Sequence, residues 1–145
     1  MESSAMSDEW AIQQVINRYT VGVSRPDWDM AIGTFAPDGE WHVVSSGLTL
    51  TGPEAIARGM QGFRGLFEWF VQVNAPAVIV VEGGTARAQS VIRENGKFAG
   101  RDEAVMVGGI YLDDLVKTAD GWRFARRAFH GAGSFHHVVT PGLGF

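Results

Sequence analysis

The chain has 145 residues, close to the usual size of one domain, and its 46% apolar and 19% charged residues exclude a largely disordered protein. The net charge of −4 argues against a nucleic-acid partner, and no apolar run is long enough to span a membrane. The lack of cysteine excludes disulfides, thiolate metal sites and a cysteine nucleophile. Because the N-terminus also lacks the pattern of a secretory signal, we expect one soluble, cytoplasmic domain.

The first half of the chain predicts helices separated by short extended segments. Residues 7–23 carry apolar side chains at helical spacing, with Ser7 placed as the N-cap, and this pattern stops before Pro26. Asp27 is placed to cap a short second helix that runs to about residue 35. The other elements expected in this half are a turn at 37–39, strands over 40–46 and 48–51, and a third helix that opens at Pro53.

The second half predicts an antiparallel sheet, so the whole chain predicts an α+β domain. The expected strands cover 69–74 and 78–82, interrupted near Pro76, and then 85–93, 104–117 and 122–130. The expected turns lie at 83–84, at 95–96 and at 119–121. We expect residues 1–7 to be flexible and residues 131–145 to form a tail that packs on the domain or on a neighbouring subunit.

The last predicted hairpin supplies candidate catalytic residues. A three-residue loop at 119–121 would pair Asp113 with Arg127 and Tyr111 with Phe129, whereas a two-residue loop would pair Asp114 with Arg127. In the first register one sheet face carries several side chains of interest together: Val107, Gly109, Tyr111, Asp113, Arg127 and Phe129. The opposite face would then carry Val116, Trp122 and Phe124, through which we expect a homodimer or homotrimer to form.

The pair of Asp113 and Arg127 has two interpretations that the sequence leaves open. In an apolar pocket, Arg127 would keep Asp113 ionised as a base or would itself bind an anionic oxygen. Alternatively, the two residues form a structural ion pair. Tyr19 lies on the apolar face of the first helix, where its hydroxyl needs a partner, and it is a candidate proton donor, as is Tyr111.

Aromatic side chains are expected to form the wall of a pocket for a small hydrophobic organic substrate. His42 follows Trp41 on a strand, so it faces the same pocket only if a bulge intervenes. The histidine spacing matches no metal-binding pattern and no glycine-rich nucleotide loop is present, so the sequence predicts neither a metal nor a cofactor. The candidate substrate-binding residues are Ser24, Trp41, His42, Phe67, Phe70, Val107 and Phe129.

Several local strings, in their order along the chain, resemble those of the SnoaL-like family, also described as nuclear-transport-factor-2-like. The strings lie at 16–19, 27–29, 35–41, 52–56, 111–113, 120–124 and Arg127. The resemblance covers about residues 8–131. It implies a single cone-shaped α+β barrel, in which N-terminal helices pack on a curved, mostly antiparallel sheet and enclose one pocket.

The resemblance also implies metal-free acid–base chemistry, as in scytalone dehydratase, hexachlorocyclohexane dehydrochlorinase, ketosteroid isomerase, limonene epoxide hydrolase and polyketide cyclases. In the dehydratase branch a histidine supported by an aspartate is the usual base, but those positions fall here on Phe70 and Ser24. We therefore expect a cofactor-independent lyase of dehydratase or elimination type, acting on an aromatic, terpenoid or polyketide-like molecule. An isomerase, cyclase or epoxide hydrolase, and a binding protein without catalysis, remain alternatives.

Overall fold

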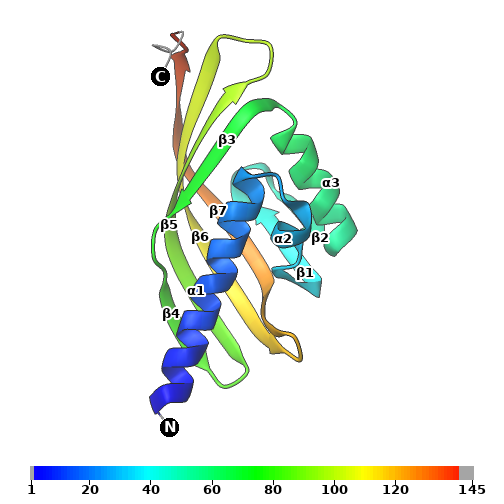
Figure 1. Cartoon of the computed structure of the whole chain (residues 1–145), viewed down its shortest axis with the longest axis vertical. Helices are drawn as coiled ribbons and strands as arrows, with labels where there is room; N and C mark the ends of the chain where they lie inside the picture. The colour runs from blue at the N-terminus through cyan, green and yellow to red at the C-terminus, as the bar shows by residue number, and fades with distance from the viewer. Residues whose placement is uncertain (1, 141–145) are drawn as a thin grey trace.

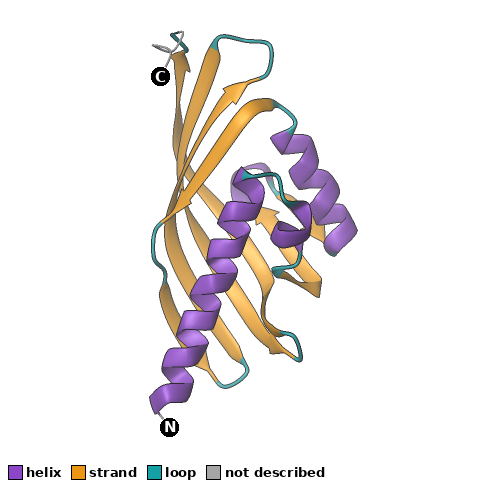
Figure 2. Ribbon diagram, viewed as in Figure 1, coloured by secondary structure: helices purple, strands orange, loops and turns teal. Residues whose placement is uncertain are grey.

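The computed structural model describes residues 2–140, which form three helices and one seven-stranded sheet (Figures 1 and 2). The helices are α1 (Glu2–Ser24), α2 (Trp28–Ile32) and α3 (Pro53–Arg64). The strands are β1 (Phe35–Val43), β2 (Leu48–Thr51), β3 (Phe67–Asn74), β4 (Val78–Glu82), β5 (Thr85–Phe98), β6 (Glu103–Thr118) and β7 (Gly121–Val138). No helix in this part of the chain is both long and apolar enough to cross a membrane.

The sheet is curved, and the helices cover one of its faces. Its strand order is β2-β1-β7-β6-β5-β3, with β4 paired to a further stretch of β5, and every pairing is antiparallel except that between β1 and β7. The α+β class is confirmed, but over residues 2–140 the sheet is open, with β2 and β3 at its ends. Helix α3 contacts both of these strands, and α2 lies between α3 and α1, which crosses the sheet (Figure 1).

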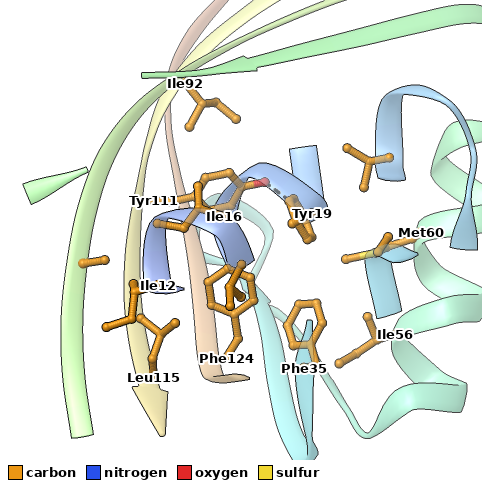
Figure 3. Close-up of a cluster of buried hydrophobic side chains, with 14 of the residues drawn as sticks. Ile12, Ile16, Tyr19, Phe35, Ile56, Met60, Ile92, Tyr111, Leu115 and Phe124 are labelled. Carbon is orange, nitrogen blue, oxygen red and sulfur yellow. Dashed lines mark hydrogen bonds between the residues drawn. The ribbon is translucent and has the colours of Figure 1, made fainter. Parts of the chain in front are cut away.

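The core lies between α1 and the inner face of the sheet. The apolar face predicted for the first helix is confirmed, because its side chains are buried against the strands (Figure 3). These helix side chains are Ile12, Val15, Ile16, Tyr19 and Val23. The expected cap of the second helix is also present, since the Met30 amide donates to Asp27 Oδ1 at 3.1 Å.

Several predicted boundaries differ from the structure. The N-cap predicted at Ser7 is wrong, since α1 already begins at Glu2 and Ser7 lies inside it. The turn predicted at 37–39 is an irregularity inside β1, where the pairing with β7 shifts between Phe35 and Glu40. The turn predicted at 95–96 is wrong, since β5 continues to Phe98 and pairs with β3 and β6 on its two sides. Residues 131–138 continue β7 rather than forming a separate tail, and residues 141–145 lie outside the described residues.

The hairpin between β6 and β7 combines a shorter loop than predicted with a β-bulge. Thr118 pairs with Gly121, so the loop has two residues, but the register shifts by one residue at Ala125. The shift restores the predicted pairing of Asp113 with Arg127. It also reverses the alternation of side chains along β7, which turns Trp122 and Phe124 inward, where they are 3% and 0% exposed. The prediction that these two residues lie on the outer face is therefore wrong.

We expect Gly109→Ala to lower the free energy of unfolding by about 1–3 kcal/mol. A Cβ atom at Gly109 would lie 2.5 Å from Phe129 Cε2 and 2.8 Å from the His130 carbonyl oxygen, and the backbone contact cannot be relieved by a rotamer change. Denaturant unfolding measures the effect. Gly108→Ala is the matched control, because a Cβ atom there would meet nothing within 4 Å. Equal losses in the two variants would contradict this steric explanation.

Candidate active site

A narrow pocket with a volume of about 30 Å³ lies between α1, α3 and the inner face of the sheet. It shares lining residues with two wider hollows of about 310 Å³ and about 220 Å³. Glu94 and Phe63 line all three spaces, so the spaces meet at these side chains. The single pocket expected from the sequence is thus a small inner pocket with two adjoining hollows.

Glu94 is the buried carboxyl group of this site. On β5 it lies opposite Gln72 of β3 and Val107 of β6, and it is only 9% exposed. Gln72 Nε2 donates a hydrogen bond to Glu94 Oε1 at 2.9 Å. Burial raises the pKa of Glu94, while the hydrogen bond from Gln72 and the charge of Arg127 act in the opposite direction. A carboxyl group with a raised pKa at a pocket wall is suited to proton transfer.

Two tyrosine hydroxyls lie beside this carboxyl group. Tyr19 Oη and Tyr111 Oη are 3.3 Å apart and hydrogen-bonded (Figure 3), and both residues line the inner pocket. Gln72 Nε2 also donates to Tyr111 Oη at 3.4 Å. Burial raises the pKa of Tyr19 to about 12 and that of Tyr111 well above its usual value. Both hydroxyls therefore keep their protons near neutral pH. Because one of them donates its single hydrogen to the other, one O–H is left to donate to an oxygen atom in the pocket.

Arg127 lies behind the tyrosines, enclosed by aromatic rings. Its guanidinium carbon is 3.6 Å from the ring centroid of Tyr111, 4.3 Å from that of Tyr19 and 4.5 Å from that of Phe124. The side chain is fully buried. Such close contacts between a cation and desolvated ring faces are stabilising. The rings thus separate the guanidinium from the pocket.

Asp113 is the charge partner of Arg127, and like Arg127 it is not a lining residue of the inner pocket. Its Oδ1 is 3.4 Å from Arg127 Nε, while Arg127 Nη2 donates to Asn74 Oδ1 at 2.9 Å. Burial raises the pKa of Asp113 to about 6 against the opposing effect of Arg127. In the described structure neither Asp113 nor Arg127 lines the inner pocket or its two hollows, contrary to the expectation that they face the substrate. The geometry matches their interpretation as a structural ion pair.

Residues 4–128 match the SnoaL-like domain family over most of the chain. The chain belongs to the SnoaL-like domain family. An uncharacterized protein of Mycobacterium tuberculosis (strain ATCC 25618 / H37Rv) is 28% identical over 123 residues, which cover 84% of each chain. The resemblance inferred from the sequence is confirmed.

Solved structures share this fold at low sequence identity. A hexachlorocyclohexane dehydrochlorinase, LinA type 2, superposes with a TM-score of 0.90 at 13% identity and covers all of both chains. A candidate scytalone dehydratase from Novosphingobium aromaticivorans DSM 12444 superposes with a TM-score of 0.84 at 20% identity, over 100% of this chain and 99% of that one. At such identities the likeness establishes the fold of this SnoaL-like domain and leaves its reaction to be argued from the site.

Five of the predicted substrate-binding residues line the site of this SnoaL-like domain: Trp41, Phe67, Phe70, Val107 and Phe129. Two others are placed elsewhere among the described residues. Ser24 Oγ donates to the Thr20 carbonyl at 2.8 Å and accepts from the Gln72 amide at 3.0 Å, so it ties α1 to β3. His42 Nδ1 is hydrogen-bonded to Thr49 Oγ1 at 2.6 Å, away from the pocket lining.

Sequence reasoning missed Glu94 and Gln72. The predicted strand ended at residue 93 because Asn95 and Gly96 are a strong turn signal. The alternation of inward side chains along β5 in fact continues through Glu94 to Phe98. Gly96 is needed for a different reason: a Cβ atom there would come within 2.5 Å of the Phe67 ring. The continuing alternation was the signal that could have identified Glu94.

Several buried polar atoms around the inner pocket have no hydrogen-bond partner among the described residues: Trp41 Nε1, Arg64 Nε and Gln72 Oε1. All three side chains line the pocket. Buried polar atoms of this kind are normally paired in folded proteins, so a pocket bordered by two donors and one acceptor suits an oxygen-bearing ligand. Within residues 2–140, no three His, Asp or Glu side chains lie close enough together to hold a metal ion.

Proposed function

We propose that this SnoaL-like domain is a lyase that removes water, or a related small group, from a small and mainly apolar molecule by acid–base chemistry. The observation that carries the proposal is the position of Glu94, a buried carboxyl group that lines the inner pocket and both hollows next to a tyrosine hydroxyl. Two of the structurally similar proteins carry the names of elimination enzymes, a dehydrochlorinase and a scytalone dehydratase, and this supports elimination as the reaction.

The apolar body of the substrate would occupy the hollow of about 310 Å³, whose walls include Val43, Leu48 and Phe129. Its oxygen-bearing group would enter the inner pocket, where the free O–H of the hydrogen-bonded pair of Tyr19 and Tyr111 donates a hydrogen bond to it. These positions place the two halves of the substrate on either side of Glu94.

The ionised carboxylate of Glu94 then removes a proton from a substrate carbon. The electron pair of that C–H bond forms a carbon–carbon double bond as the neighbouring C–O bond breaks. The departing oxygen, which accepts a hydrogen bond from the tyrosine pair, takes the proton held by Glu94 and leaves as water. This last transfer returns Glu94 to its carboxylate form.

A proton-transfer isomerase is the second candidate. It is favoured by the same position of Glu94, because a carboxyl group shielded from solvent can hold a proton and return it to a different carbon of the same molecule. Product masses separate the candidates. A product that has lost water identifies the lyase. A product of unchanged mass identifies an isomerase or cyclase, and a product that has gained water identifies an epoxide hydrolase. Tight binding without product would identify a binding protein.

The elimination probe 5-nitrobenzisoxazole tests the proposed chemistry before the natural substrate is known. A base removes its ring C–H proton, the N–O bond breaks, and a coloured nitrophenolate that carries a nitrile is formed. We expect the protein to catalyse this elimination at least about a hundredfold faster than an equal concentration of acetate does. The rate should rise with pH through the raised pKa of Glu94, because the carboxylate is the base. A rate no higher than that of the same protein after denaturation would contradict the proposal.

A further inference from the structure

The hollow of about 220 Å³ extends from Glu94 along β5, β6 and β7 to His136. These strands continue beyond the end of α1 toward the C-terminus (Figure 1). One wall of the hollow is formed by Phe67 and Phe98, whose rings stack with centroids 4.9 Å apart and planes 24° from parallel. A flat aromatic wall of this kind suits a ring rather than a flexible chain.

A histidine–carboxylate pair lies at the outer end of this hollow. His136 Nδ1 is 2.7 Å from Glu103 Oε1, and its imidazole stacks on Phe98 with planes 18° from parallel. Arg101 Nη1 is 3.3 Å from Glu103 Oε2, so the carboxylate also has a cationic neighbour. The hydrogen bond from His136 lowers the pKa of Glu103, with a smaller contribution from the charge of Arg101.

The hydrogen-bonding roles of the imidazole follow from this pairing. An ionised carboxylate only accepts hydrogen bonds, so His136 Nδ1 carries the hydrogen that Glu103 receives. In the neutral imidazole the remaining nitrogen, Nε2, then has a free lone pair. In this neutral form, His136 offers an acceptor at the outer end of the hollow, which matches the O–H of a phenol or an alcohol.

We propose that this hollow is a second substrate subsite, in which a distal ring lies against Phe67 and Phe98 and its hydroxyl group donates a hydrogen bond to His136 Nε2. Glu94 lines both this subsite and the reaction pocket, so one extended molecule can react at its inner end while its outer end is held by His136. The proposal rests on the proposed function, because Glu94 marks the reacting end. It makes His136 a specificity-determining residue that takes no part in proton transfer.

The test compares the binding of 2-naphthol and 2-methoxynaphthalene by titration calorimetry, since the two probes share a ring system and differ in the O–H donor. We expect the wild-type protein to bind 2-naphthol about fivefold more tightly, as one additional hydrogen bond provides. In His136→Phe the ratio should fall to about one, because the ring is kept and the acceptor is lost. His137→Phe is the matched control: His137 pairs with Ala104 on the opposite side of the strand and should leave the ratio unchanged.

Failure of wild-type protein to bind 2-naphthol, or an unchanged ratio in His136→Phe, would overturn the subsite. Nitrogen NMR of His136 gives an independent readout, because the proposal requires the Nδ1–H form and a change at Nε2 when 2-naphthol binds. The Glu94→Gln variant separates this proposal from the previous one. If Glu94→Gln keeps both the fivefold binding ratio and the full rate of elimination, the reaction assignment fails and the subsite stands. If Glu94→Gln loses the rate of elimination and the wild-type protein shows no such binding ratio, the reaction assignment stands and the subsite fails.

Discussion

Glu94→Gln is expected to lower the rate of 5-nitrobenzisoxazole elimination by about a hundredfold to ten-thousandfold, the range typical of losing a positioned general base. Glutamine keeps the size of the side chain and can still accept the hydrogen bond from Gln72, but it cannot take a proton. The rate is measured from the absorbance of the nitrophenolate product. The remaining rate should also lose the pH dependence that the raised pKa of Glu94 produces in the wild-type protein.

Stability provides the internal check on this variant. Because the pKa of Glu94 is raised in the folded state, the folded protein holds a proton that the unfolded chain releases, and the contribution of this group to stability falls as pH rises through that interval. Glu94→Gln removes this loss, so its melting temperature should equal or exceed that of the wild type. Glu68→Gln is the matched control, since Glu68 is exposed and paired with Lys97. A full rate in Glu94→Gln would refute the assigned role.

Arg127→Ala is expected to lower the free energy of unfolding by about 3–5 kcal/mol. The substitution leaves Asp113 buried without its cation, and it removes the guanidinium that fills the space between Tyr19, Tyr111 and Phe124. For a domain of this size, the melting temperature should fall by about 10 °C or more. Thermal and denaturant unfolding measure the change.

The loss in Arg127→Ala should depend on pH in a defined direction. In the wild-type protein the pKa of Asp113 is about 6, above its usual value of 3.8, so the stability that this group contributes is lost as pH rises between these two values. Removing the cation raises the pKa further, and Asp113 then becomes neutral over a wider range. The variant should therefore lose less stability at about pH 5 than at about pH 8.

The double variant Asp113→Asn, Arg127→Ala tests whether the two charges act as a pair. It should recover part of the stability lost in Arg127→Ala, because no unpaired ion is left in the core. An Arg127→Ala protein that keeps its melting temperature but loses all turnover would contradict this account. It would return Arg127 to direct contact with the substrate.

The hairpin of β6 and β7 shows how a correct pairing can follow from an incorrect loop. A three-residue loop was predicted, and the structure has a two-residue loop followed by a bulge at Ala125. Both arrangements pair Asp113 with Arg127, but only the bulge also turns Trp122 and Phe124 inward. No local residue pattern marked Ala125 as the extra residue. Its position depends on how β7 pairs with β6 on one side and with β1 on the other.

The amino-acid sequence alone determined the helix spacing, the cap at Asp27, most strand positions and the α+β class. Each of these depends on neighbours within a few residues along the chain. The identity of the acid in the pocket depended on the tertiary structure. Glu94 faces the pocket because β5 runs on through a predicted turn and pairs with β3 and β6, and Asp113 is excluded from it by the rings that enclose Arg127. Which buried polar group meets a ligand is set by contacts between strands far apart in sequence, and local patterns carry no record of those contacts.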